Sequence, residues 1–360
     1  MNKKEPCGLL GRKLGHSYSP IIHRQIADYE YGFFEVEPED VNDFFARREF
    51  MAINVTMPYK KVALEACDFV SDEARAIGSV NTVVKDAEGR LHGYNTDAPG
   101  MVYMLRKAGI EAKGRKCMIL GSGGSSVMAQ YMLKKMGAKE VVVISRSGEN
   151  NYDNIDRHSD AEIIINATPV GMYPDTGKAA IDINRFPACV GVADFIYNPA
   201  ATKLLLDARR AGIRHTNGTP MLAAQAKYAS DLFLGTERSD DIIGPIVENL
   251  ARSMRNIIVM CSSVEECVPL GREVAAQTGR EIIDLTEEKI SPEQLNEHCK
   301  QSGKLILLPH LALDAHAENA LFQNGVLFTD TEVESLVGDI IRFKGNTREE
   351  RVNEIMKRMA

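Results

Sequence analysis

The chain has 360 residues, a length that favours two or three domains over a single core. Hydrophobic residues make up 44% and charged residues 26%, as in ordinary globular domains, and the net charge of −7 argues against a general nucleic-acid-binding role. No apolar run reaches the roughly 20 residues that span a bilayer, and the N-terminus lacks the apolar core of a signal peptide. The seven cysteines form no CxxC pair, so we expect reduced thiols in a cytoplasm, without a zinc site or a disulfide framework.

The first region contains strand-like runs that each end in polar or turn residues. The runs are FFEVEP, AINVTMP, SVNTVVKD and, after the turn AEG, RLHGYNTD. Because short β-branched runs alternate with helical patterns, we predict an α/β fold with parallel strands. Such sheets place ligand contacts at strand ends, which here carry Asn54, Thr56, Lys60, Asn81, Asn95 and Asp97.

Two further α/β regions follow along the chain. The second begins near Gly114 with the buried run KCMIL, continues through three more apolar runs and a short strand at 213–218, and closes with a helical stretch at 221–253. The third begins at about Met254 with the run RNIIVM. No repeat or low-complexity tract separates these regions, so the boundary at 253/254 is expected to be tight.

A glycine-rich turn follows the first strand of the second region. Gly121, Gly123 and Gly124 lie between this strand and a helix, where glycines let the backbone approach a pyrophosphate and the helix N-terminus offers free N–H groups. Ser126 replaces the third glycine of the usual fingerprint. The context favours a dinucleotide site over the alternative, a plain tight turn.

The end of the next strand favours NADP over NAD. An NAD site usually has an acid there for the ribose hydroxyl, whereas this strand ends in Ser145, Arg146 and Ser147. A guanidinium and hydroxyls suit a 2′-phosphate. The alternative is a solvent-exposed arginine without a ligand.

Lys60 and Asp97 each follow a strand-like run. A lysine held by a carboxylate can pass a proton to a developing alkoxide, which carbonyl reduction by hydride requires. From spacing alone, Lys60 is equally well a surface residue, and Asp97 the N-cap of a helix over 100–109.

Eight segments in order resemble the shikimate dehydrogenase family and cover essentially residues 7–253. They are GRKLGHSYSP, INVTMPYK, IGSVNTV, GYNTDAPG, GSGGSS, NATPVGM, FIYNP and NGTPMLAAQA. The resemblance implies reversible, NADP-dependent reduction of 3-dehydroshikimate to shikimate, on the route to chorismate and the aromatic amino acids. It implies no metal, because a lysine supplies the charge stabilisation.

The resemblance also assigns roles to individual residues. Lys60 and Asp97 match the catalytic pair, and Ser17 and Ser19 match the hydroxyls that bind the substrate carboxylate. The other substrate contacts implied are Thr56, Asn81, Gln225 and Tyr197. The cofactor residues implied are Gly121, Gly123, Gly124, Ser125, Ser145, Arg146, Ser147 and Thr168, with Gly218 at the nicotinamide end. Ser145 stands where the family often has Asn, and His16 is expected to pack in its loop rather than to catalyse.

The C-terminal third resembles a shikimate kinase that has lost its phosphate loop. The positions of the loop glycines hold Cys261, Val264 and Glu266, while Cys267 replaces the phosphate-binding Lys and Val268 the magnesium-binding Ser or Thr. Pro309, His310 and Leu311 likewise replace the glycines of a second loop. Since Glu265 and Glu266 would repel a polyanion, we expect no ATP site. The alternative is an α/β module of unknown role.

These observations together predict an α/β protein of three domains. They are a substrate-binding domain at 1–99 plus 219–253, a Rossmann NADP-binding domain at 100–218, and a degenerate kinase-like domain at 254–360 that lacks its phosphate loop. The C-terminal domain is a candidate surface for a homodimer or a pathway-enzyme partner. Two alternatives stay open: a quinate/shikimate dehydrogenase of broader specificity, and a non-enzymatic sensor of shikimate or NADP.

Overall fold

The computed structural model describes residues 5–15, 17–286, 290–309, 314–333, 335 and 338–359. His16, His310 and Leu311, on which expectations were placed, lie outside the described residues. The chain forms two compact units, Met1–Asn150 with Pro220–Val247, and Asn151–Thr219 with Glu248–Ala360. Among the described residues, no helix combines the length and the apolarity that crossing a membrane requires.

The first sheet has six strands. In order across the sheet they are β2 (Tyr31–Glu35), β1 (Cys7–Gly11), β3 (Ala52–Val55), β5 (Thr82–Lys85), β6 (Leu91–Tyr94) and β4 (Phe69–Val70). The helices between these strands are α1 (Ser19–Ile26), α2 (Val41–Arg47), α3 (Lys60–Ala66) and α4 (Asp72–Ile77). A cluster that includes Leu10, Phe50, Ile53 and Val83 forms the apolar core beneath α2 and α3.

The expectation of parallel strands is wrong for β5. This strand pairs antiparallel with both β3 and β6. The pairing with β6 follows from the short turn at 86–90, where the Asp86 N–H donates to the Arg90 carbonyl, because a connection this short can only reverse the chain. The hairpin brings Asn81, just before β5, close to the end of β6, where the chain enters α5.

The second sheet has five strands, in the order β11 (Arg214–Thr216), β10 (Gly191–Asp194), β9 (Ile163–Asn166), β7 (Lys116–Leu120) and β8 (Glu140–Ile144). Its associated helices are α5 (Asp97–Lys107), α6 (Gly124–Lys135) and α7 (Lys203–Arg210), with short 3₁₀ turns η1 (Ile155–His158) and η2 (Ile183–Arg185). Helix α5 begins earlier than the expected 100–109, and Thr96 rather than Asp97 occupies its N-cap. The helical stretch expected at 221–253 is divided into α8 (Thr219–Leu234), η3 (Asp240–Ile242) and α9 (Ile243–Met254).

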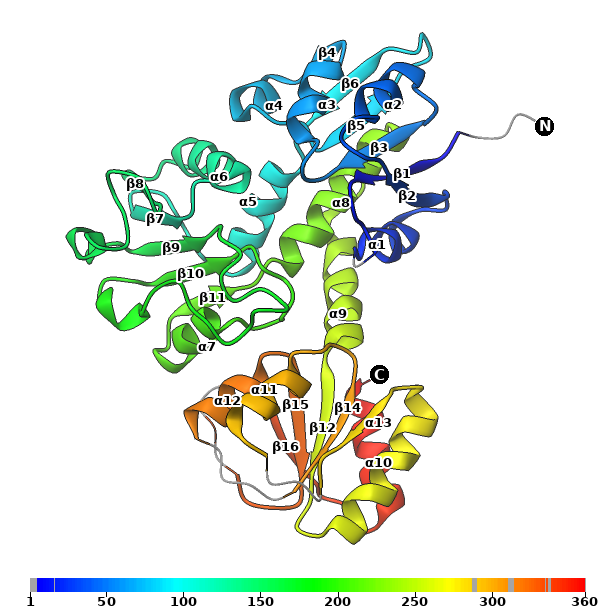
Figure 1. The fold of residues 1–360 in the computed structure, drawn as a ribbon, viewed down its shortest axis with the longest axis vertical. Coiled ribbons are helices and arrows are strands. Elements are labelled where there is room, and N and C mark those ends of the chain that lie inside the picture. The colour runs from blue at the N-terminus through cyan, green and yellow to red at the C-terminus, as the bar shows by residue number, and fades with distance from the viewer. Residues whose placement is uncertain are drawn as a thin grey trace. The chain divides into compact units, whose positions relative to one another are not determined.

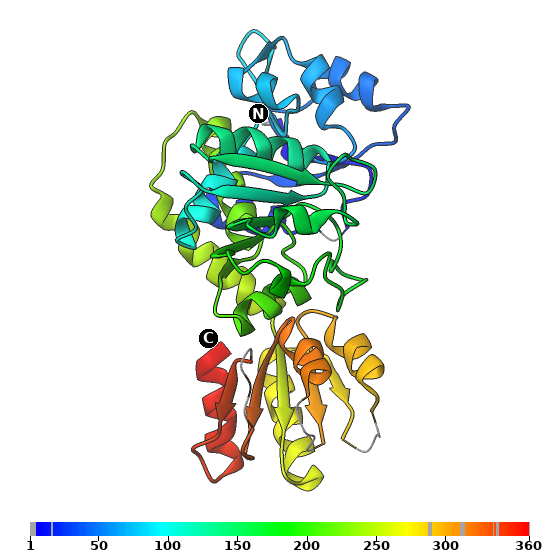
Figure 2. The same ribbon diagram turned by 90° about the vertical axis from the view of Figure 1, so that its left-hand side faces the viewer.

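All four strand pairs of the third sheet are parallel within the described residues. Its order is β13 (Ile282–Asp284), β14 (Leu305–Leu308), β12 (Asn256–Met260), β15 (Gly325–Thr329) and β16 (Ile340–Arg342). Helices α10 (Val264–Thr278) and α13 (Arg348–Met359) cover one face, and α11 (Pro292–Cys299) and α12 (Ala315–Phe322) cover the other (Figures 1 and 2). Alternate residues of β12 enter opposite clusters, since Ile257 and Val259 pack towards α10 and α13 while Ile258 packs towards α11 and α12.

Candidate active site

Lys60 and Asp97 meet at the ends of two neighbouring elements of the first unit. Lys60 begins α3 and Asp97 begins α5, and the Lys60 ammonium donates to Asp97 Oδ2 at 2.6 Å. The two side chains are 24% and 15% exposed, so the pair is shielded yet reachable. Because the carboxylate fixes the ammonium, Lys60 can present its remaining N–H donors to a bound oxygen.

Asn81 holds the start of α5 and reaches towards α8. Its Oδ1 accepts hydrogen bonds from the Thr96 N–H at 2.7 Å and from the Thr82 hydroxyl at 3.0 Å. These donors fix the amide, so that Nδ2 points the other way and donates to Gln225 Oε1 at 3.2 Å. Gly100 permits this approach of α5 to α8, because a Cβ there would lie 3.0 Å from the Met221 carbonyl oxygen.

Ser17 and Ser19 lie together at the start of α1. The Ser17 hydroxyl donates to Ser19 Oγ at 3.1 Å, and both side chains are half-buried. Thr56, also half-buried, follows β3, where its N–H donates to the Leu10 carbonyl at 2.9 Å. Two serine hydroxyls side by side are suited to a carboxylate, which accepts through both of its oxygens.

A group of stacked rings surrounds His23, which lies in α1. Tyr31 stacks on His23 with 3.8 Å between ring centroids and donates to Asn54 Oδ1 at 2.8 Å. Burial raises the pKa of Tyr31 well above its usual value and lowers the pKa of His23 to about 3. Both rings therefore stay neutral near pH 7, and they support α1 without adding charge.

The glycine turn between β7 and α6 has the geometry that a pyrophosphate needs. Gly121 has φ +101°, which favours glycine, and its N–H donates to the Ile144 carbonyl at the end of β8. A Cβ at Gly123 or Gly124 would meet open space, and Gly123 is the N-cap of α6. The loop with Ser125 therefore leaves room for a diphosphate beside the first N–H groups of the helix.

Ser145, Arg146 and Ser147 follow β8, which pairs with β7 so that Leu120 lies opposite Ile144. The Arg146 side chain is exposed and has no carboxylate partner in the part of the chain that the structure describes. Both strands therefore end at one edge of the sheet, with a free guanidinium next to the glycine turn. This arrangement fits the 2′-phosphate of NADP.

In the second unit, a buried carboxylate joins the loops that carry Thr168, Tyr197 and Gly218. Asp194, at the end of β10, accepts from the Thr202 hydroxyl at 2.7 Å, from the Ile196 N–H at 3.0 Å and from Asn166 Nδ2 at 3.0 Å. Asn166 Oδ1 in turn accepts from the Thr168 hydroxyl at 2.6 Å.

Gly218 packs against the turn at 195–197, which follows β10. Its N–H donates to the Ile196 carbonyl at 2.9 Å, and a Cβ at this position would lie 2.2 Å from the Phe195 carbonyl oxygen. The half-buried Tyr197 lies between these contacts and the start of α7. Asp194, Asn166 and Thr202 were not singled out in the sequence, although polar residues at the ends of β9 and β10 were the available signal.

Asp194 gives the stability of the protein a specific pH dependence. Burial raises the pKa of this carboxyl to about 6 from its usual 3.8. The folded state therefore retains the proton that the unfolded chain loses, so its stabilising contribution is complete below about pH 4 and is lost as the pH rises to about 6. We expect the free energy of unfolding, relative to Asp194→Asn, to fall across this window by about 1.4 kcal/mol per unit of pKa difference. Urea denaturation of both proteins between pH 4 and 7 measures it, and a constant difference would contradict the expectation.

The loop after β12 is hydrogen-bonded to the side chain of Asp330. The Ser262 N–H donates to Asp330 Oδ1 at 2.8 Å and its hydroxyl to Asp330 Oδ2 at 3.0 Å. Arg351 contacts Glu266 at 3.0 Å and Asp330 at 3.5 Å. This loop lies at the carboxyl end of the central strand, where parallel sheets usually bind ligands, and acidic side chains now occupy it.

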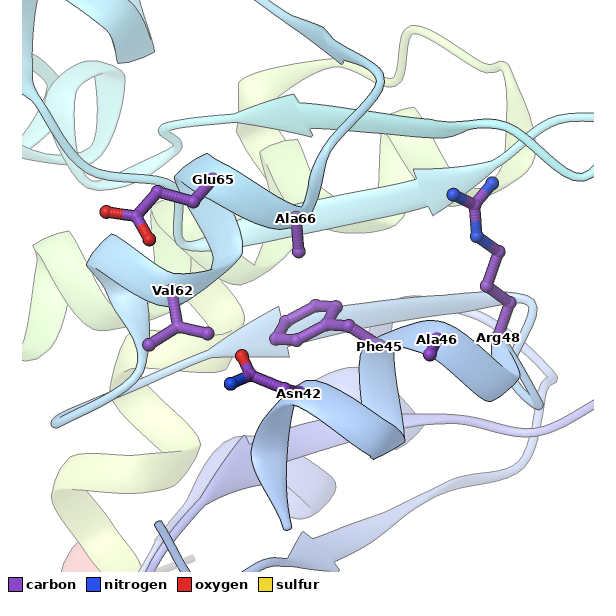
Figure 3. A pocket seen from close by; sticks show the side chains of 7 residues that line it. All are labelled: Asn42, Phe45, Ala46, Arg48, Val62, Glu65 and Ala66. Atoms are coloured by element: carbon purple, nitrogen blue, oxygen red, sulfur yellow. The ribbon is translucent and has the colours of Figure 1, made fainter. Parts of the chain in front are cut away.

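A cavity of ≈ 300 Å³ lies elsewhere in the first unit, between α2 and α3 (Figure 3). It is lined by Asn42, Phe45, Ala46, Arg48, Val62, Glu65 and Ala66, none of which is a predicted site residue. Arg48 is engaged by Asp68 at 2.9 Å. Within the described ranges, no cluster of three or more His, Cys, Asp or Glu side chains forms a metal site.

The first two thirds of the chain are similar to known dehydrogenases. The family model of the shikimate dehydrogenase substrate-binding domain matches residues 9–83. The NADP(+) shikimate dehydrogenase of Caldanaerobacter subterraneus subsp. tengcongensis is 32% identical over 265 residues, which cover 66% of this chain and 94% of that protein. That of Caldicellulosiruptor bescii is 36% identical over 246 residues, covering 61% and 85%.

Solved structures give a consistent result. A chorismate mutase/shikimate 5-dehydrogenase fusion protein from Clostridium acetobutylicum aligns with TM-score 0.65 and 34% identity, covering 69% of this chain and 97% of that one. The Thermus thermophilus shikimate 5-dehydrogenase in complex with NADP(H) and shikimate aligns with TM-score 0.61 and 30% identity, covering 67% and 98%. The quinate dehydrogenase of Corynebacterium glutamicum in complex with NAD aligns with TM-score 0.61 and 27% identity, covering 69% and 98%.

Proposed function

The chain belongs to the shikimate dehydrogenase family, and from that premise we propose that it reduces 3-dehydroshikimate reversibly to shikimate with NADPH. The observation that carries the proposal is the shielded Lys60–Asp97 pair, with Nζ and Oδ2 2.6 Å apart. The test is turnover of shikimate with NADP+, followed as NADPH formation. Quinate and NAD+ in parallel reactions distinguish a broader quinate/shikimate enzyme, and tight binding without turnover would identify a sensor.

Lys60 is the proposed acid and base. When bound, NADPH would supply the hydride that the carbonyl carbon receives. Lys60 gives its proton to the oxygen of that carbonyl in reduction and takes it back in oxidation. Asp97 accepts from the ammonium, keeps it oriented, and can accept from a hydroxyl neighbouring the reacting carbon.

The proposed substrate contacts use the hydroxyls and amides of the first unit. Ser17 and Ser19 bind the carboxylate, while Thr56, Asn81 and Gln225 bind ring hydroxyls. The support for Asn81 and Gln225 is the hydrogen bond between their amides, which places the two side chains side by side between β5 and α8. Tyr197 is proposed to lie near the substrate and nicotinamide, with Thr168 and Gly218 on the cofactor side.

Arg146 is proposed to select NADP. Arg146→Ala is expected to raise KM for NADP+ about tenfold or more, because a charged hydrogen bond to phosphate is lost, while KM for NAD+ changes little. Steady-state kinetics with both cofactors measure this. The matched control is Arg47→Ala, an exposed arginine of α2 that lies 3.8 Å from Glu49. Equal effects on both cofactors would remove Arg146 from the 2′-phosphate site.

The three-domain division, at 1–99 plus 219–253, 100–218 and 254–360, is proposed on the ground that each range contains one complete sheet. We also propose that residues 254–360 are a degenerate kinase-like domain. We propose that this domain contacts a second copy of the chain or a pathway-enzyme partner. We also propose a cytoplasmic location, which suits the seven free thiols.

The degenerate domain is expected to transfer no phosphoryl group. The chain lacks the loop glycines, the lysine and the magnesium ligand, and Asp330 already takes up the Ser262 donors. Phosphoryl transfer depends on stabilising charge at that position, which a carboxylate opposes. Incubation of the full chain with ATP, magnesium and shikimate should yield no shikimate 3-phosphate. Product above an enzyme-free background would contradict this reading.

A further inference from the structure

An apolar contact joins α7 to residues 254–360, here called the C-terminal module. Leu206 of α7 is 2% exposed and belongs to the same apolar cluster as Ile258, Leu295 and Phe322 of the module. Ala201, just before α7, packs against this cluster. A side chain that completes the core of another segment fixes its own helix to that segment.

Hydrogen bonds at the turn before α7 reinforce the apolar contact. The Ala200 N–H donates to Asn324 Oδ1 at 2.8 Å, and the Ala201 N–H donates to the Gln323 carbonyl at 2.8 Å. At the other end of α7, Arg210 contacts Glu318 at 3.0 Å, and the Glu318 side chain is only 12% exposed. The module thus holds both ends of α7.

The same turn also supports the loop at Gly218. The Ala200 carbonyl accepts from Asn217 Nδ2 at 2.7 Å, and Gly218 N–H donates to the Ile196 carbonyl. The Ala200 N–H is therefore bonded to the module, and the Ala200 carbonyl is bonded to Asn217, the residue that precedes Gly218. Asn324 is 2% exposed, so water does not compete for its bond.

We propose that the C-terminal module serves the dehydrogenase reaction as a clamp, and that Asn324 is a positioning residue which acts through Ala200 on the turn that carries Tyr197 and supports Gly218. The inference rests on the proposed function for its catalytic readout. In this proposal the module transfers no phosphoryl group. Its role is to keep the turn that carries Tyr197 and Ala200 ordered at the nicotinamide end of the site. The clamp itself is a physical contact that can be measured without turnover.

Asn324→Ala in the full chain tests the clamp. We expect faster hydrogen–deuterium exchange at residues 200–201, and a fall in kcat of about three- to tenfold, which corresponds to one net hydrogen bond. KM for shikimate should stay within twofold, since Ser17, Ser19 and Asn81 belong to the other unit. Asn324→Asp keeps an oxygen for the Ala200 N–H but loses the donor to the Lys300 carbonyl, and should restore kcat to within about threefold.

The matched control is Asn319→Ala on α12. The Oδ1 of Asn319 is buried and has no hydrogen-bond partner among the described residues, so its removal should change neither exchange at 200–201 nor kcat. Equal effects of the two alanine variants, or no effect of either, would overturn the proposal, as would faster exchange with unchanged kcat.

Faster exchange of β12 in Asn324→Ala would mean that this variant loosens the whole module. The decision then passes to Asn324→Asp, provided that β12 stays protected from exchange in that variant. A retained kcat in Asn324→Asp supports the clamp, and a lost kcat overturns it. Should the unsubstituted chain turn over neither shikimate nor quinate, the proposed function fails, and exchange at 200–201 alone decides whether Asn324 holds the turn.

Discussion

Replacing Lys60 with alanine is expected to lower kcat by about 100-fold or more and to change KM for shikimate much less. The ammonium, held 2.6 Å from Asp97 Oδ2, is the proposed proton donor to the substrate oxygen. Removing a group that acts in the transition state lowers kcat, whereas Ser17, Ser19 and Asn81 are the proposed contacts for ground-state binding. Steady-state oxidation of shikimate at saturating NADP+ measures both constants.

The neighbouring lysine gives a matched control. Lys61 follows Lys60 on α3 and is exposed, so Lys61→Ala should keep near-normal kcat. A Lys60→Ala protein with near-normal kcat would show that another group transfers the proton.

Gly218→Ala is expected to reduce kcat/KM for NADP+ by roughly 100-fold. The new Cβ would lie 2.2 Å from the Phe195 carbonyl oxygen and 2.7 Å from its carbon, both backbone atoms, so the turn at 195–197 must move. Displacement of a positioned group by about 1 Å can cost about 100-fold in rate. Kinetics with varied NADP+, together with circular dichroism to establish that the variant folds, test this expectation.

Gly244→Ala is the corresponding control. Gly244 lies in α9, and a Cβ there meets nothing within 4 Å, so the substitution should leave kinetics unchanged. A Gly218→Ala protein with normal kinetics would mean that the nicotinamide end of the site lies elsewhere.

Local sequence signals were sufficient where one short segment carries all the information. The run KCMIL followed by Gly121 and Gly123 predicted a strand, a tight turn and a helix, and the structure has β7, the turn and α6 there. Apolar runs likewise indicated the strands of the second sheet, whereas β1 and the short β4 of the first sheet were not among the predicted runs. The α/β class was confirmed for this reason, because strand and helix periodicities are local properties.

Pairing between distant segments was not predictable from one sequence. The antiparallel pairing of β5 with β3 joins strands that α3, β4 and α4 separate along the chain, and the bond between Asn81 and Gln225 joins residues 144 positions apart. The Asp194 network requires the ends of β9 and β10 to be neighbours, which only the strand order reveals. The apolar run containing Leu206 indicates a buried helix face, but nothing local indicates that its partner lies beyond residue 254.

The bonds between Ser262 and Asp330 constrain any attempt to build a phosphate-binding loop after β12 by substitution. Cys267 is 1% exposed and lies in the apolar cluster that contains Val259, so Cys267→Lys alone would bury an ammonium in this core, which is costly. Removing Asp330 first would take one of two carboxylates from Arg351 and leave the Ser262 donors without this acceptor. Single substitutions towards a phosphate loop would therefore each be unfavourable, so a nucleotide site is expected to be difficult to build here one step at a time.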